Sequence, residues 1–357
     1  MKTNIIAKSI EQSMSLKDEP LFINLTTEGF VIDGYLDKEL TRARKILRGE
    51  DDGPSAQRQL NWLYTQDSET EVWQNRSSWV KSNPSLGIIK RWDYLDEQID
   101  IARQSKVDRI FVLCKDFNIK MNGVESWLDI RDYTYDEKFD LENFRGVHCL
   151  GAVDLSETTD LTSAKILMMK KGDNTKYIYQ HYWIPESKLE ESNDIDAQAK
   201  YIDWAREGLI TICPGSDIDL SLVGDWFYQL YTDYGIRLWK CGYDQRFSHD
   251  WICRMEQYGW QRTGNDATSH LILINQSPEV LSDAIKTCEG DFRHQLISYN
   301  QHEVDKWCLK NASLYFDKKG KCLLVKSKPT QRIDGAVSLV ILYEMYRRYR
   351  TTFQQLL

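Results

Sequence analysis

The sequence lacks the long apolar run that a membrane helix requires. No stretch approaches the roughly 18 consecutive apolar residues that span a bilayer. The longest candidate, residues 336–345, is interrupted by Glu344. The first six residues also fail to form the apolar core of a secretory signal. These absences predict a cytosolic protein with no membrane partner.

The sequence also lacks the cysteine spacing of a metal or disulfide framework. Its eight cysteines are scattered, and none belongs to a CxxC pair. A zinc site and a disulfide scaffold are therefore both disfavoured, and the thiols are expected to act as small core side chains. A length of 357 residues is enough for about two domains.

The net charge of −8 argues against a protein that coats nucleic acid without selectivity. The C-terminal part differs, because residues 306–350 hold eleven lysines and arginines against three acids. Cations beside a carboxylate cluster are typical of a nuclease, where they hold phosphates while the carboxylates hold metal. The alternative is a solvated basic face on a terminal helix.

Three carboxylates stand at the ends of apolar elements. Asp154 ends the strand-like run 147–155, Asp244 ends the run 236–244, and Asp334 opens a long apolar helix. Mg²⁺ and Mn²⁺ prefer oxygen ligands. The pattern therefore predicts a hard-cation site and favours a metal-dependent phosphodiesterase.

The order of predicted elements indicates the fold. Three strands joined by short turns are expected over 147–155, 164–171 and 176–184. Helices and strands then alternate: helices 197–207 and 220–231, strand 236–244, helix 249–258, strand 270–274, and helices 278–288 and 303–311. A hairpin over 312–325 and the helix from Asp334 complete the chain.

This order is that of an RNase H-like α/β fold with a mixed central sheet flanked by helices. In such a fold the first and fourth strands are neighbours, so Asp154 and Asp244 are expected at matching strand ends. Upstream, the pattern predicts a helix within 1–20, a buried strand over 20–25, and helices over 36–47, 55–64 and 94–104.

The same segments resemble the large terminase subunit of tailed double-stranded DNA phages. Residues 151–156 (GAVDLS) resemble its first acidic motif, Tyr243-Asp244 its second, and residues 332–339 (RIDGAVSL), with Lys328 upstream, its third. Upstream, residues 25–29 (LTTEG) resemble the coupling motif of its ATPase, and residues 79–87 (WVKSNPSLG) the segment after the ATPase core.

The resemblance implies a remnant of the ATPase domain over 1–115, a linker over 116–142 and a nuclease domain over 143–357. The sequence departs from the family in lacking a GxxxxGK[ST] phosphate-binding loop. We therefore expect no ATP hydrolysis by this polypeptide alone. The resemblance thus suggests a shortened polypeptide or the product of a split or decayed gene.

The resemblance also implies the site and its partners. Asp154, Asp244 and Asp334 would hold two divalent ions, Mg²⁺ or Mn²⁺, with Asp160 as a secondary ligand. Basic side chains that would contact DNA are Lys326, Lys328 and Arg332. The expected partners are double-stranded DNA, the small terminase subunit and the portal protein, in the cytoplasm of a bacterial host.

Several alternatives remain open from the residues alone. Asp250 lies close to Asp244, Asp334 is also a good N-cap for its helix, and Asp160 could simply order its own turn. At the level of function, one rival is a resolvase or transposase that uses the same fold and acids. The other is a non-catalytic remnant that binds DNA or the portal.

Overall fold

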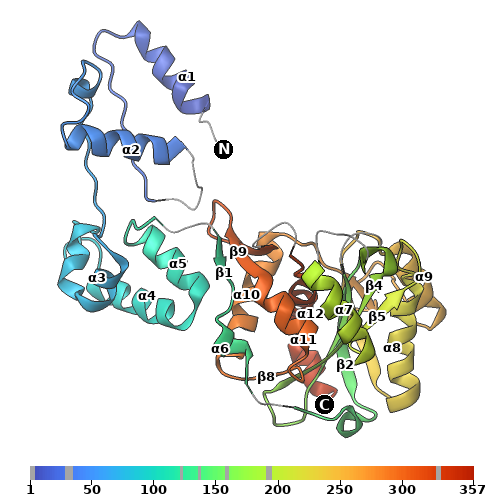
Figure 1. Cartoon of the computed structure of the whole chain (residues 1–357). Coiled ribbons are helices and arrows are strands. Elements are labelled where there is room, and N and C mark those ends of the chain that lie inside the picture. The colour runs from blue at the N-terminus through green and yellow to red at the C-terminus, as the bar shows by residue number, and fades with distance from the viewer. Residues whose placement is uncertain are drawn as a thin grey trace. The chain divides into compact units, whose positions relative to one another are not determined.

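The computed structural model describes residues 5–28, 35–120, 124–135, 138–156, 161–189, 195–326 and 331–357. The chain divides into two compact units (Figure 1). The first contains residues 1–123 and 316–320, and the second contains residues 124–315 and 321–357. The first division, between residues 123 and 124, falls inside the predicted linker 116–142.

In the described part of residues 1–123, the regular elements of the first unit are helices and 3-10 turns. Its helices are α1 (Ile5–Ser13), α2 (Tyr35–Leu47), α3 (Glu69–Gln74), α4 (Trp92–Gln104) and α5 (Lys106–Lys115). Short 3-10 turns lie at Met14–Leu16, Ala56–Arg58 and Arg76–Lys81. The hydroxyl of Ser68 caps α3 by accepting from the backbone N–H of Glu71. Helices predicted within 1–20 and over 36–47 and 94–104 are thus confirmed.

Two predictions for this unit are wrong. Residues 20–25 are extended but join no sheet, and Leu21, Ile23 and Leu25 are 82%, 66% and 90% exposed. Residues 59–64 form no helix, and only the 3-10 turn Ala56–Arg58 lies within the predicted range 55–64.

The second unit is built on a seven-stranded mixed sheet (Figure 1). Its order is β5-β4-β3-β2-β6-β7, and β8 also pairs with β4. The strands are β2 (His148–Asp154), β3 (Thr162–Met168), β4 (Lys176–Pro185), β5 (Ile210–Cys213), β6 (Arg237–Tyr243), β7 (Leu271–Leu273) and β8 (Ile297–Ser298). β2, β3 and β4 pair antiparallel, whereas β2–β6, β6–β7 and β4–β5 are parallel.

A smaller sheet and seven helices complete the described part of this unit. The small sheet has the order β1-β9-β10, with β1 at Val124–Ser126, β9 at Ala312–Phe316 and β10 at Cys322–Lys326. The helices are α6 (Ile130–Tyr133), α7 (Ile195–Arg206), α8 (Ser221–Tyr234), α9 (His249–Gln257), α10 (Pro278–Arg293), α11 (Glu303–Asn311) and α12 (Asp334–Gln355). 3-10 turns lie at Leu141–Phe144 and Glu186–Leu189.

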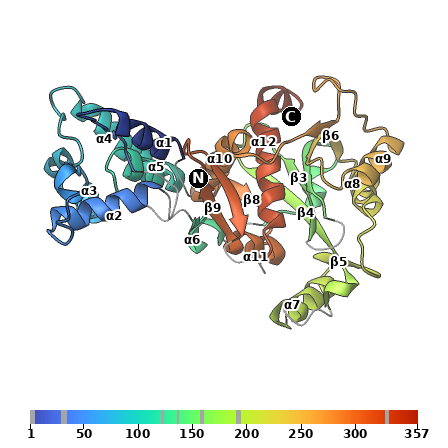
Figure 2. The ribbon, with the colours of Figure 1, turned by 90° about the horizontal axis from the view of Figure 1, so that it is seen from above.

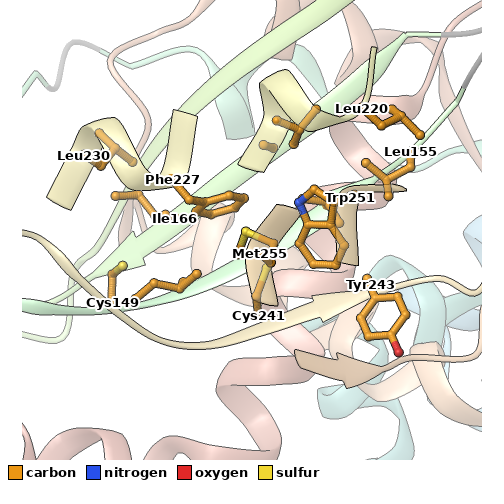
Figure 3. Packing of buried hydrophobic residues seen from close by; sticks show 14 of the residues in the cluster. Cys149, Leu155, Ile166, Leu220, Phe227, Leu230, Cys241, Tyr243, Trp251 and Met255 are labelled. Carbon is orange, nitrogen blue, oxygen red and sulfur yellow. The ribbon is translucent and has the colours of Figure 1, made fainter. Parts of the chain in front are cut away.

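One face of the large sheet packs against α8 and α9. Figure 3 shows Phe227, Trp251 and Met255 of these helices directed toward Cys241 and Tyr243 of β6. The rings of Tyr243 and Trp251 lie 5.5 Å apart. Gly235, in the left-handed conformation at φ 67°, ends α8 and directs the chain into β6.

The opposite face of the sheet is covered by α12, which packs on β2, β3 and β6 (Figure 2). The contact with β6 is close, because a Cβ added at Gly242 would lie 2.7 Å from Cγ of Met345 and 3.0 Å from Cγ2 of Ile341. Further along, the hydroxyls of Ser163 on β3 and Ser338 on α12 lie 2.8 Å apart. The sheet is thus buried on both faces.

Candidate functional site

Two of the predicted carboxylates lie at the ends of neighbouring parallel strands. The β2–β6 register pairs Ala152 with Gly242. Continued two residues further, the same register would bring Asp154 opposite Asp244, the residue that follows β6. Adjacent strands are about 4.8 Å apart, so the two half-buried acids extend the same edge of the sheet.

These two acids also share a face. Asp154 pairs with Ser163 across β2–β3, and Ser163 contacts α12. Gly242 faces α12 as well, and side chains alternate along a strand. Asp154 and Asp244 therefore belong to the face that α12 covers.

The third carboxylate, Asp334, is the first residue of α12 and is 7% exposed. The N-cap position belongs to Ile333, so the interpretation of Asp334 as the cap does not match the helix boundary. The side-chain amide of Asn311 donates to the carbonyl of Arg332 at 3.1 Å and holds the approach to the helix. The pKa of the Cys308 thiol on α11 is raised mainly by burial and secondly by the negative charge of Asp334. Asp334 therefore lies near α11.

Gln276, which was not predicted as a site residue, contacts Asp154. Gln276 Nε2 donates to Asp154 Oδ1 at 3.3 Å. Gln276 lies in the loop between β7 and α10, close to Ser277 and Pro278, which begin that helix. A neutral amide that donates to a carboxylate fixes its orientation without competing for its charge. Asp244 Oδ1 instead accepts from the backbone N–H of Gln245 at 2.7 Å.

The remaining predicted residues divide between described and undescribed positions. Arg332 precedes α12 and Lys326 ends β10, and both are half-buried. Asp160 and Lys328 lie outside the described residues. Asp250 is exposed on α9. Across the described ranges, no three or more His, Cys, Asp or Glu side chains are grouped closely enough to share a metal ion.

The donor chemistry nevertheless fits a hard cation. Asp154, Asp244 and Asp334 supply only carboxylate oxygens, and Gln276 supports the first of them. Histidine is not part of this set. Burial lowers the pKa of both His181 and His302 to about 4, and His181 Nε2 lies 2.8 Å from the hydroxyl of Thr211.

The sheet order and the helix on its face form an RNase H-like α/β fold, as predicted. The family described as "Terminase large subunit, endonuclease domain" matches residues 56–349. The chain therefore belongs to that family. The match begins within residues 1–115, which were predicted as an ATPase remnant.

Individual relatives agree with this assignment. The large subunit of the terminase of Enterobacteria phage HK97 is 26% identical over 272 residues, which cover 74% of this chain and 50% of that protein. Protein YmfN of Escherichia coli (strain K12) is 21% identical over 359 residues, which cover 95% and 73%. The chain thus spans half the length of the HK97 relative.

The crystal structure of the HK97 large terminase superposes with a TM-score of 0.52 at 20% identity. The superposition covers 96% of this chain and 67% of that one. At this identity the likeness concerns the fold. In the part of the chain that the structure describes, no helix is long and apolar enough to span a membrane.

Proposed function

We propose that this chain is a metal-dependent endonuclease that cuts double-stranded viral DNA during genome packaging. Asp154, Asp244 and Asp334 would together hold two divalent ions, Mg²⁺ or Mn²⁺. Such ions, when bound, lower the pKa of a water molecule and offset charge on the phosphate. The observation that supports the proposal is the parallel β2–β6 register, which pairs Ala152 with Gly242, two residues before Asp154 and Asp244 respectively.

The residues of the chain have separate tasks in this proposal. Asp154 would help to hold the ions, and Gln276, which donates to its carboxylate, would keep that carboxylate oriented. Asp334 would add a third carboxylate from the first turn of α12. Lys326, Lys328 and Arg332 would contact the DNA backbone, which fixes position without reading sequence. By family, the small terminase subunit and the portal protein are the proposed partners.

The test is cleavage of supercoiled plasmid in Mn²⁺, Mg²⁺ or EDTA. We expect metal-dependent nicking and linearisation that is lost in Asp154→Asn and Asp244→Asn. Gln276→Ala should retain cleavage but lose about 10–100-fold in rate, as is typical of residues that support a metal ligand. Asp250→Asn is the matched control, because Asp250 is exposed on α9 only six positions beyond Asp244.

Calorimetric titration with Mn²⁺ provides a second readout that does not depend on cleavage. The wild type and Asp250→Asn should bind Mn²⁺, and Asp154→Asn should not. Full cleavage by Asp154→Asn would remove that residue from the site. A wild-type chain that neither binds Mn²⁺ nor cuts DNA would support the non-catalytic docking remnant instead.

A further inference from the structure

Lys165 is a lysine in the interior of the large sheet. It lies in the middle of β3, where all seven residues are buried, and its exposed fraction is 0%. It pairs with Ala152, two residues before Asp154, and therefore faces α12. A buried ammonium group needs a charged partner and hydrogen bonds to offset the loss of water.

Two buried side chains supply these contacts. Lys165 Nζ donates to Tyr182 Oη at 3.0 Å and forms an ion pair with Asp305 Oδ1. Tyr182 Oη in turn donates to the same carboxylate oxygen at 2.6 Å. The three groups, from β3, β4 and α11, close a triangle, which we call the Lys165 clamp.

The histidine beside the clamp, His302, adds no positive charge to it near neutral pH. His302 Nδ1 lies 3.7 Å from Asp305 Oδ2, and its ring is 5.4 Å from that of Tyr182. Burial lowers the pKa of His302 to about 4, so the ring is neutral. Burial also raises the pKa of Tyr182, which keeps its hydroxyl protonated.

The first turn of α12 rests directly on the clamp. A Cβ added at Gly335 would collide with Tyr182 Oη and would lie 3.2 Å from both Asp305 Oδ1 and Cys308 Cβ. The residue before Gly335 is Asp334. Ser338, one turn later, contacts Ser163 on β3 and donates to the carbonyl of Gly335 at 3.1 Å.

A buried ion pair is an unusual way to fill this space. Replacing such a pair by apolar side chains of similar volume is often neutral or stabilising, so the pair is weak evidence for a role in stability. Fixing one geometry is the better-supported use of buried polar groups. Here that geometry belongs to the turn that carries an acid of the proposed site.

We propose that the Lys165 clamp is a positioning unit that sets the first turn of α12, and thereby the Asp334 carboxylate, relative to the strands that carry Asp154 and Asp244. This inference rests on the proposed nuclease function. It assigns Lys165, Tyr182 and Asp305 a role through Asp334, with no contact to the DNA.

The chain offers a matched control under the same helix. Lys176 Nζ pairs with Asp291 Oδ2 at 2.8 Å, and Tyr343 Oη donates to that oxygen at 2.9 Å. In this second Lys–Asp–Tyr group, the tyrosine belongs to the middle of α12, more than two turns beyond Asp334. It has the same three residue types, joined through the carboxylate, but does not contact the first turn.

The experiment compares two apolar triple variants, Lys165→Met/Tyr182→Phe/Asp305→Leu and Lys176→Met/Tyr343→Phe/Asp291→Leu. Urea unfolding should show both to be folded, whereas Lys165→Met alone should be strongly destabilised because it leaves Asp305 buried and unpaired. The clamp variant should bind Mn²⁺ about 10–100-fold more weakly. Its kcat for plasmid nicking should fall while KM for DNA is unchanged, and the control should resemble the wild type.

Hydrogen exchange separates failure of this inference from failure of the proposed function. Backbone amides in the first turn of α12 should exchange faster in the clamp variant and at the wild-type rate in the control, whether or not metal binds. A folded clamp variant with wild-type exchange, Mn²⁺ affinity and kcat would overturn the inference. A wild-type chain that neither binds Mn²⁺ nor cuts DNA would overturn the proposed nuclease function. The hydrogen-exchange rates in the first turn of α12 would then decide whether the clamp holds this turn in place.

Discussion

The contact between β6 and α12 predicts opposite effects for two glycine-to-alanine substitutions. At Gly242 a new Cβ would lie 2.7 Å from Cγ and 3.1 Å from Sδ of Met345, and 3.0 Å from Cγ2 of Ile341. These atoms are buried between the sheet and the helix. An added methyl group in a filled core costs about 1–3 kcal/mol.

At Gly290, inside α10, an added Cβ would meet no atom within 4 Å. Alanine is favoured over glycine inside a helix by about 0.5–1 kcal/mol. Gly290→Ala should therefore raise the free energy of unfolding, whereas Gly242→Ala should lower it. The comparison separates the local contact from the general effect of replacing glycine.

Thermal unfolding followed by circular dichroism measures the difference. A change of 1 kcal/mol shifts Tm by about 2–4 °C in a domain of 150–250 residues, so Gly242→Ala should lower Tm by roughly 2–12 °C. It should also slow cleavage, because the displaced helix carries Asp334. A Gly242→Ala chain as stable as the wild type would refute the close packing of α12 on β6.

Two further predictions concern titration and thiol chemistry. Burial lowers the pKa of His181 and His302 from 6.5 to about 4. The unfolded chain therefore binds protons more readily than the folded chain between these pH values. The free energy of unfolding should be highest above pH 6.5 and should fall as the pH drops toward 4. Each ring contributes at most roughly 3 kcal/mol, and urea midpoints that do not change over this range would contradict the burial. None of the eight cysteines forms a disulfide, and Cys253 is exposed whereas the other seven are buried. A thiol reagent should therefore label one cysteine per native chain, and Cys253→Ser should abolish the label.

The second unit could be predicted well because most of its strands are recognisable in the sequence as apolar runs between turns. The runs 147–155, 176–184 and 236–244 are apolar and bounded by turns, and each forms a strand close to the expected limits. Their order was enough to predict that the first and fourth strands are neighbours. The short strand β5 was missed because four residues carry little periodicity.

The first unit was predicted less well because local pattern does not determine burial. Residues 20–25 form an apolar run typical of a buried strand, yet such a segment is buried only where neighbours cover it, and Leu21, Ile23 and Leu25 are exposed. Within the described part of the unit, no strand pairs with this segment.

Parts of the candidate site also have no sequence signal. Gln276 lies in a loop, and nothing in its flanking residues indicates contact with Asp154, which is 122 positions away. Lys165 could be read as an ordinary polar residue of a strand. Its partner Asp305 lies 140 positions further on, and only the fold brings the two together.

The proposed site is assembled from distant parts of the chain, and this bears on when it can first exist. Asp154, Asp244 and Asp334 are separated by 90 residues each, and Asp334 opens α12. During synthesis that helix is made after the strands that precede Asp154 and Asp244. A nascent chain that has not yet reached residue 334 would therefore hold only part of the proposed ligand set.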